Sequence, residues 1–236
     1  MKKLFLIVLS LIACTFSMHA KTFKVNSIAS LQNAINIAKP GDNIIVANGI
    51  YTTSESIVIK NSGTSVNKIT IEAESIDSVE ITGTNGFVIA PPSSYIIIKG
   101  FRFSHKTGTN TILAGATHCV ITRNVFECVP VNTGRKDGLG ASSITFSNNI
   151  IRGGEPVSIQ GKYTDPVWSG NILWKTTGGD IPAEGYKIAD PGFMQDKNGV
   201  FHSSLNHSTN SSGRYDTIQE SNRPLTISDV GPGADK

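Results

Sequence analysis

Charged residues are scarce in this chain of 236 residues, at 17% of the composition, whereas glycine is abundant with 23 residues. This balance disfavours a helical bundle and favours β-structure with many turns. An excess of one charge sign is also missing: taking Lys2 and Lys3, which lie in a predicted targeting segment, from the 21 basic residues leaves 19 against 18 acidic ones. Such a balance gives no support for a nucleic-acid or membrane-surface partner.

Cysteine is equally scarce, with three residues in the chain. Cys14 falls in the targeting segment, so the folded part holds Cys119 and Cys128. Two cysteines do not make a disulfide framework, and we expect both to be buried as small apolar side chains.

The apolar run from Leu4 to Ala13 follows a basic start and is too short to span a bilayer comfortably. We therefore predict a bacterial signal peptide over residues 1–20 and no transmembrane segment. Two processing routes stay open: cleavage after Ala20, which we favour, or lipid attachment at Cys14, because Leu11 to Cys14 resembles the bacterial lipobox. Either route predicts an exported protein, periplasmic or extracellular, and we expect a monomer.

Short β-rich segments fill the chain after residue 42, at 43–47, 56–60, 68–73, 79–82 and 87–90. Several are apolar at consecutive positions, as in Ile96 to Ile98, so strict alternation does not describe them. A motif then repeats as IIKGFRF (97–103), VITRNVF (120–126), TFSNNII (145–151) and VWSGNIL (167–173). We align its central residues as Gly100, Asn124, Asn149 and Asn171.

Asparagine and glycine tolerate the left-handed backbone region, so the central residue of each repeat is predicted to mark a corner between two strands. A chain that lays each turn about 4.8 Å above the previous one would stack these corners. A leucine-rich solenoid is the alternative for this repeat length, but its leucine spacing is absent. The sequence therefore predicts an all-β protein with a right-handed parallel β-helix over residues 21–200 and a flexible tail over 201–236.

Residues 27–38 are the exception to the β-pattern, because their apolar side chains follow one helical stripe. Ser27 is a suitable N-cap, and the segment KPGD at 39–42 provides a stop. We expect this amphipathic helix to cap the exposed backbone edge at the N-terminal end of the solenoid.

The segments at 30–51 (SLQNAINIAKPGDNIIVANGIY), 68–74, 79–83 and 95–105 (YIIIKGFRFSH) resemble polysaccharide lyase family 6, the chondroitinase B and alginate lyase group of secreted bacterial enzymes. The C-terminal segments 144–151, 168–174 and 186–191 resemble that family's closing rungs. The resemblance implies β-elimination beside a uronic acid in alginate or chondroitin/dermatan sulfate. It also implies a lysine base, a nearby arginine and a calcium ion held by acidic and asparagine oxygens.

The chain departs from the family after residue 129, where PVNTGRKDGLGASS (130–143) leads directly into the closing rungs. The central block that carries the family's lysine, arginine and calcium ligands has no counterpart. No catalytic residue is therefore assigned by resemblance, no calcium ligand is identified in this chain, and we interpret the protein as an internally shortened relative.

Five basic residues lie on or beside adjacent rungs: Arg102, His105, Lys106, His118 and Arg123. We predict that Arg102, His105, Lys106 and Arg123 bind substrate as a basic strip that meets an acidic polysaccharide. The competing interpretation is a set of solvated edges and turns.

Further candidates are weaker. Arg135 and Lys136 lie in the glycine-rich junction, where a basic loop is the plainer interpretation. The acids Glu127, Asp137 and Glu155 are too scattered to claim a calcium cluster, and His202 and His207 belong to the predicted tail. Trp168 and Trp174 either stack on sugar rings or close the C-terminal end of the solenoid.

Three functions follow from these observations. The first is an exported lyase that cleaves a uronic-acid polysaccharide. The second is a β-helix that binds glycan, or serves as a surface scaffold, without turnover. The third is a truncated remnant without activity.

Overall fold

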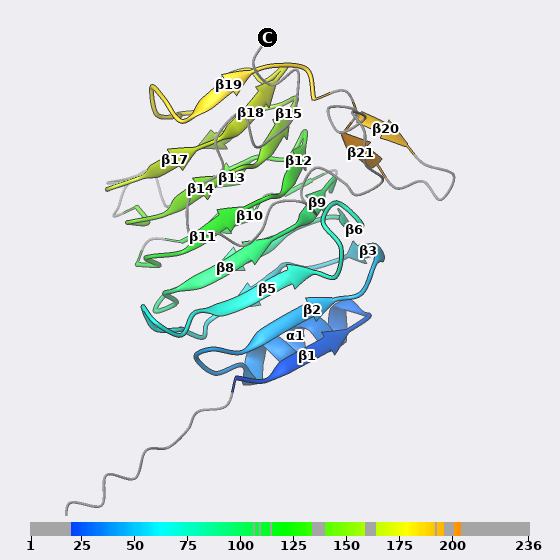
Figure 1. Ribbon diagram of the computed structural model, residues 1–236, viewed down its shortest axis with the longest axis vertical. Helices are drawn as coiled ribbons and strands as arrows, with labels where there is room; N and C mark the ends of the chain where they lie inside the picture. The colour runs from blue at the N-terminus through cyan, green and yellow to red at the C-terminus, as the bar shows by residue number, and fades with distance from the viewer. Residues whose placement is uncertain are drawn as a thin grey trace, which may run out of the picture.

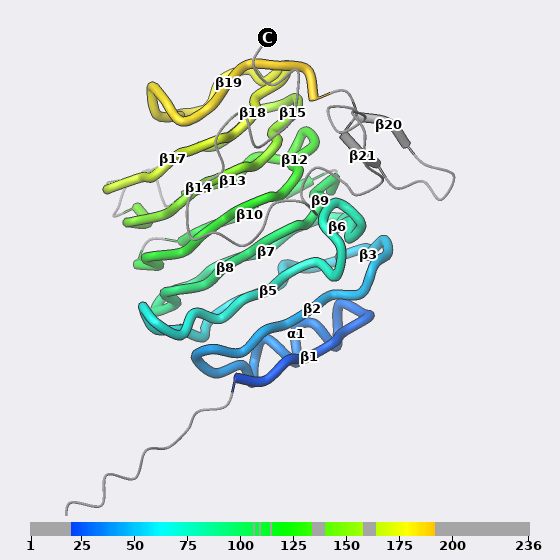
Figure 2. The backbone as a smooth tube through the Cα atoms, in the orientation of Figure 1, coloured from blue at the N-terminus to red at the C-terminus, as the bar shows by residue number. Residues whose placement is uncertain are grey.

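The computed structural model describes residues 20–105, 107–108, 110–113, 115–133, 140–158, 164–191, 193–195 and 201–203. The chain winds through three parallel sheets in turn, and most circuits add one strand to each sheet (Figure 1). The colour of the tube rises steadily from the blue N-terminal end to the yellow C-terminal end (Figure 2). The predicted parallel β-helix is therefore confirmed.

The first and second sheets have seven strands each, and the third has five. The first sheet consists of β1 (Thr22–Val25), β2 (Asn43–Val46), β5 (Ile69–Ala73), β8 (Ile96–Lys99), β11 (Val120–Thr122), β14 (Thr145–Ser147) and β17 (Val167–Ser169). The second consists of β3 (Gly49–Thr53), β6 (Val79–Gly83), β9 (Phe101–Phe103), β12 (Val125–Glu127), β15 (Ile150–Arg152), β18 (Asn171–Trp174) and β19 (Tyr186–Ile188). The third consists of β4 (Ile57–Ile59), β7 (Phe87–Ile89), β10 (Asn110–Ile112), β13 (Val131–Asn132) and β16 (Val157–Ser158).

The core is built from ladders of inward side chains. The strand register of the first sheet stacks one such ladder from Ile44 through Ile71, Ile98, Ile121 and Phe146 to Trp168. Every member is buried, and the residues beside them face outward, as in the alternation of buried and partly buried residues along β5. Each fully buried isoleucine or phenylalanine contributes about 1.5–3 kcal/mol. Inward and outward side chains therefore alternate along these strands even where consecutive residues are apolar.

The stack continues across the glycine-rich junction. Strand β11 pairs with β14 in register, with Ile121 opposite Phe146, although residues 134–139 between them lie outside the described part. On the second sheet Phe126 likewise lies opposite Ile151. The rungs on the two sides of the junction therefore match, and the solenoid keeps a continuous core there.

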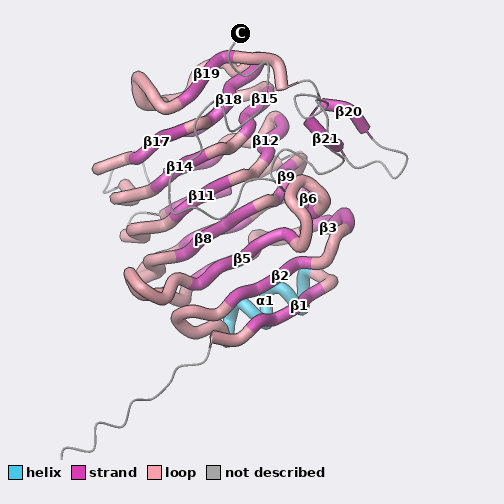
Figure 3. The backbone as a smooth tube through the Cα atoms, in the orientation of Figure 1, coloured by secondary structure: helices cyan, strands magenta, loops and turns pink. Residues whose placement is uncertain are grey.

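Within the described residues, the helix α1 (Ile28–Ile37) is the one helical element, and it lies at the N-terminal end (Figure 3). Ser27 and Ser30 form a reciprocal capping box at its start. The Gln32 side chain donates to the Val58 carbonyl and accepts from the Val58 N–H, each at 2.8 Å. Because β4 is an edge strand, this amide replaces the partner strand that β4 lacks.

A small antiparallel pair, β20 (Phe193–Gln195) and β21 (Phe201–Ser203), follows the solenoid. His202 lies in β21, whereas His207 and the rest of the predicted tail, residues 204–236, lie outside the described part. The signal peptide also lies almost wholly outside it. The division into signal peptide, solenoid and tail stays a prediction.

The asparagine corners are stacked as predicted, but their alignment needs a correction. The left-handed residues are Gly100, Arg123, Asn148 and Gly170, with φ of 84°, 56°, 58° and 62°. Each lies one residue before the position we assigned, apart from Gly100. Strand register places Gly100 opposite Arg123, so the first spacing is one residue shorter than the predicted alignment required.

Asn124, Asn149 and Asn171 occur at the corner for a different reason, which is hydrogen bonding. Asn149 Oδ1 accepts from the Asn124 N–H at 3.0 Å, and Asn149 Nδ2 donates to the Ile121 carbonyl at 2.9 Å. Asn171 Oδ1 accepts from the Asn149 N–H and from Asn149 Nδ2, both at 3.0 Å. All three amides are buried, so this asparagine ladder satisfies backbone groups at the bend that no strand can reach.

Candidate functional site

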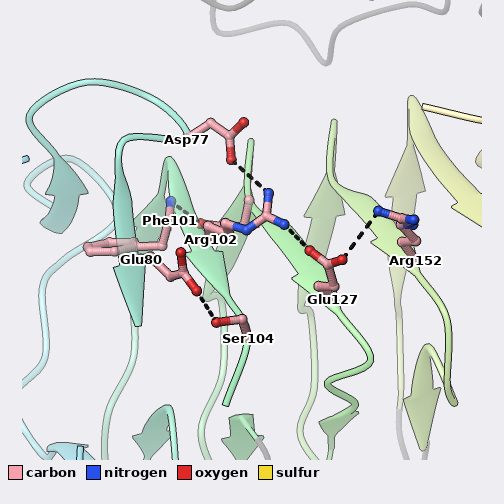
Figure 4. Close-up of polar contacts among 8 residues, drawn as sticks. Asp77, Glu80, Phe101, Arg102, Ser104, Glu127 and Arg152 are labelled. Carbon is pink, nitrogen blue, oxygen red and sulfur yellow. Dashed lines mark hydrogen bonds and ion pairs between the residues drawn. The ribbon is translucent and has the colours of Figure 1, made fainter. Parts of the chain in front are cut away.

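A ladder of charged side chains runs along the outer face of the second sheet (Figure 4). We define the charged ladder as Asp77, Glu80, Arg102, Glu127 and Arg152. Arg102 lies 3.8 Å from Asp77 (Nη1 to Oδ1) and pairs directly with Glu127 through Nη2. Glu127 then reaches Arg152 at 3.2 Å, and Ser104 donates to Glu80. Strand register places Glu80 opposite Arg102 and Glu127 opposite Arg152. Arg102 lies opposite Val125, so it reaches Glu127 diagonally, two residues further along β12.

Arg102 is the buried centre of the charged ladder, with 1% of its surface exposed. Burial lowers the pKa of its guanidinium, whereas the carboxylates of Asp77 and Glu80 act in the opposite direction. An arginine this far from water is tied to its carboxylate partners rather than offered to a ligand.

The outer end of the charged ladder is more accessible. The Arg152 side chain is 38% exposed, compared with 24% for Glu127. Strand register places Glu127, Arg152 and Trp174 side by side on successive rungs, and we call these three residues the outer row. Trp174 is half-buried, and Lys175 Nζ lies 5.5 Å from its ring centroid. A guanidinium next to an indole ring suits an anionic sugar, because the first pairs with carboxylates and the second stacks on pyranose rings.

The predicted basic strip is not what the described residues form. Arg102, His105 and Arg123 are buried, because the first belongs to the charged ladder, the second points inward and the third occupies a tight corner. Lys106 lies outside the described residues. His118 is exposed, on a different corner of the solenoid. A substrate role for Arg102, His105, Lys106 and Arg123 stays a prediction, but the three buried side chains do not line a surface.

His105 lies against the core. Its Nδ1 lies 3.0 Å from the Thr107 carbonyl, and its Nε2 lies 3.4 Å from Asn110 Nδ2. The Nδ1 atom therefore carries the proton and Nε2 accepts from the Asn110 amide. Burial lowers the pKa of His105, and the hydrogen bond to Thr107 opposes this shift.

The structure describes some of the weaker candidates and leaves others outside its described residues. Trp168 is buried against Phe146 in the core, with ring centroids 5.4 Å apart, which matches the closing role rather than the sugar-stacking one. Glu155 is exposed, and Arg135, Lys136 and Asp137 lie outside the described part. Sequence reasoning missed Arg152 as a candidate. The register of the repeats, which places Arg152 one rung after Glu127, was the signal that could have found it.

The expectation of two buried cysteines is correct for one of them. Cys119 is buried, and burial raises its thiol pKa to about 11. Cys128 is exposed, in a turn with φ 55° directly after β12.

A calcium site does not fit the described residues. None of their His, Cys, Asp and Glu side chains form a group of three able to hold a metal ion. The carboxylates of the charged ladder are engaged by Arg102, Arg152 and Ser104.

No helix within the described ranges is long and apolar enough to cross a membrane.

Three parallel sheets wound around one core define the chain as a parallel β-solenoid protein. Residues 25–137 match the family model described as Chondroitinase B, so that part of the chain is similar to this family. No curated protein sequence matches the chain.

Solved structures of alginate lyases and a polysaccharide lyase resemble the chain at low identity. The PL6 family alginate lyase AlyGC is 21% identical, with 65% of this chain and 21% of that chain covered and a TM-score of 0.42. An alginate lyase from Paenibacillus sp. str. FPU-7 is 19% identical, with 66% of this chain and 65% of that chain covered and a TM-score of 0.47. The PL6 family polysaccharide lyase Pedsa3628 from Pseudopedobacter saltans is 14% identical, with 70% of this chain and 40% of that chain covered and a TM-score of 0.43. The chain thus spans between about a fifth and just under two thirds of these proteins.

Proposed function

We propose that the protein is exported and acts on a uronic-acid polysaccharide, alginate or chondroitin/dermatan sulfate, by β-elimination. The observation that carries this proposal is the match of residues 25–137 to the chondroitinase B family, on a chain whose fold is a parallel β-solenoid. The outer row supports it, because Arg152 and Trp174 offer a cation and an aromatic ring on one accessible face.

The reaction needs two groups. A base removes the proton at C5, and a cation neutralises the adjacent carboxylate, so that the developing negative charge is tolerated. The electron pair of the C5–H bond forms the C4–C5 double bond, and the glycosidic oxygen leaves C4. Arg152 is the candidate cation, because its guanidinium can bind a carboxylate with two parallel hydrogen bonds. We assign the base to no described residue; Lys106, beside the rungs, and Lys136, in the glycine-rich junction, are the lysines to test for this role.

A second candidate function is glycan binding without turnover. The observation that favours it is the composition of the charged ladder, which holds three acids and two arginines. Arg102, one of the two, is already paired with Asp77 and Glu127. Such a face holds a sugar through Trp174 and Arg152 more readily than it stabilises a carbanion.

The test follows both activities in one set of samples. The full chain is mixed with alginate and with dermatan sulfate, with calcium or with a chelator, and the ultraviolet absorbance of the new C4–C5 double bond is recorded. Migration of the protein through a gel that contains each polysaccharide is measured in parallel. Arg152→Ala, Lys106→Ala and Lys136→Ala are compared with Lys99→Ala, which removes a cation paired with Glu72 on the first sheet.

Absorbance that grows with wild type, and that Arg152→Ala and one lysine variant abolish while Lys99→Ala does not, supports the lyase. Retarded migration without absorbance supports binding alone. A protein that neither cleaves nor migrates more slowly with any polysaccharide overturns both.

A further inference from the structure

A second corner of the solenoid, directly before the strands of the first sheet, carries a column of four left-handed residues. Tyr95, His118, Ser143 and Asp165 have φ of 56°, 54°, 51° and 52°. The register of β8, β11, β14 and β17 places them on four successive rungs. None is glycine, although this backbone region is costly for other residues, so side chains are retained here in spite of that cost.

The His118 ring is held in a fixed orientation. One of its faces stacks on Tyr95, with ring centroids 4.8 Å apart and planes at 22°. Thr117 Oγ1 lies 2.8 Å from His118 Nδ1, and Ser142 Oγ donates to Thr117 Oγ1 at 3.0 Å. This hydrogen bond holds Nδ1 at Thr117 and turns Nε2 away from it, and the tautomer of the ring sets which of the two atoms, Nδ1 or Thr117 Oγ1, donates.

The other face of His118 points along the column toward the next rung. The residue there is Ser143, whose side chain is too small to cover a ring, and Asp165 follows one rung later. His118 and Asp165 are exposed. The column therefore presents an aromatic face, a hydroxyl and a carboxylate at the rung spacing of about 4.8 Å.

We propose that His118, Ser143 and Asp165 form a subsite for one pyranose ring of a polysaccharide. The ring stacks on the face of His118 that Tyr95 leaves open, and its hydroxyl groups bind Nε2, Ser143 Oγ and the Asp165 carboxylate. Asp165 repels a uronate carboxylate, so the sugar presents its hydroxyl edge to this residue. This inference rests on the proposed function and names a second contact point, on a corner outside the charged ladder and the outer row.

The test is calorimetric titration of the full chain with alginate oligosaccharides and with dermatan sulfate oligosaccharides. We expect His118→Ala to weaken binding about tenfold, because stacking and one hydrogen bond are lost together. His118→Phe, which keeps a ring and loses Nε2, should weaken binding about threefold. Asp165→Asn preserves the size of the side chain and tests its charge. Lys24→Ala is the control, on the outer face of β1.

The outcomes separate this subsite from the proposed function. Wild type that binds neither oligosaccharide overturns both. Binding that is equal in wild type, His118→Ala and Asp165→Asn overturns the subsite and leaves the proposed function standing. A second measurement covers a His118→Ala variant that fails to fold: the imidazole proton resonances of His118 in wild type must shift on titration with oligosaccharide, and unchanged resonances contradict the proposal.

Discussion

Two corners of the solenoid place left-handed residues on successive rungs, yet they are used differently. The corner between the first and second sheets carries the buried asparagine ladder, whose members are identical and bonded to one another. The corner before the first sheet carries Tyr95, His118, Ser143 and Asp165, which differ from rung to rung and reach solvent.

The difference teaches how to separate structure from function in a repeat protein. A polar side chain repeated on every rung and satisfied by its neighbours is explained by the backbone groups it serves. A corner whose side chains change on every rung gains no such ladder, so its residues need another explanation. The comparison predicts large stability effects at the first corner and small ones at the second.

The largest effect is expected for Asn149→Ala. The change removes the acceptor for the Asn124 N–H and the donor to the Ile121 carbonyl, and leaves both buried without partners. We expect the free energy of unfolding to fall by about 4 kcal/mol, as the sum of two or three such losses. Denaturant unfolding measures it. His118→Ala at the other corner should lose less than about 1 kcal/mol, and equal losses at the two corners would break the comparison.

Arg102→Met extends the comparison to the charged ladder. The change keeps an unbranched apolar stem but leaves Asp77 and Glu127 without this arginine, and breaking a buried pair costs about 3 kcal/mol. Arg152→Met removes the exposed end of the same ladder and should cost less than about 1 kcal/mol. Urea titration of both variants decides whether burial, rather than charge, sets the cost.

His105 is buried as well, and its effect should appear as a pH dependence. Because burial lowers its pKa in the folded state, the unfolded chain binds the proton more tightly. Stability is therefore complete above the unfolded pKa of about 6.5 and falls as the pH drops toward the folded value, by at most about 1.4 kcal/mol per pH unit. His105→Gln should flatten the stability profile below pH 6.5, measured by thermal unfolding. A profile that keeps its full slope in this variant would assign the effect to other groups.

The sequence predicted most of the fold, because stacking leaves a periodic trace. The repeat around Asn124, Asn149 and Asn171 identified the solenoid and the corner. It misplaced the left-handed residue by one position, since Gly and Asn occur there for two different reasons, positive φ and side-chain hydrogen bonding. Aligning the four segments from their first residues, with Ile97 opposite Val120 as in the strand register, separates the two reasons.

The candidate site was less predictable, because spacing does not tell which face a residue occupies. Arg102 and Arg152 both belong to outward positions of the second sheet, yet Arg102 is buried and Arg152 is partly exposed. That difference depends on two acids that pair with Arg102. One is Asp77, a loop residue 25 positions before it, and the other is Glu127, which lies between the two arginines. Likewise Tyr95 and His118 meet only because their rungs are adjacent.

Ser143→Gly is expected to change the free energy of unfolding least, and to raise it where the other variants lower it. Glycine relieves the cost of about 1–2 kcal/mol that a side chain incurs at φ 51°, while its greater freedom in the unfolded chain returns part of that gain. We expect a net stabilisation of about 0.5 kcal/mol, measured as a higher denaturation midpoint with an unchanged slope. The same change removes the hydroxyl from the proposed subsite and should weaken oligosaccharide binding about threefold. A variant that is more stable and binds less well would show that this corner retains its side chains for a ligand, whereas a less stable variant would assign Ser143 a structural role like that of the asparagines.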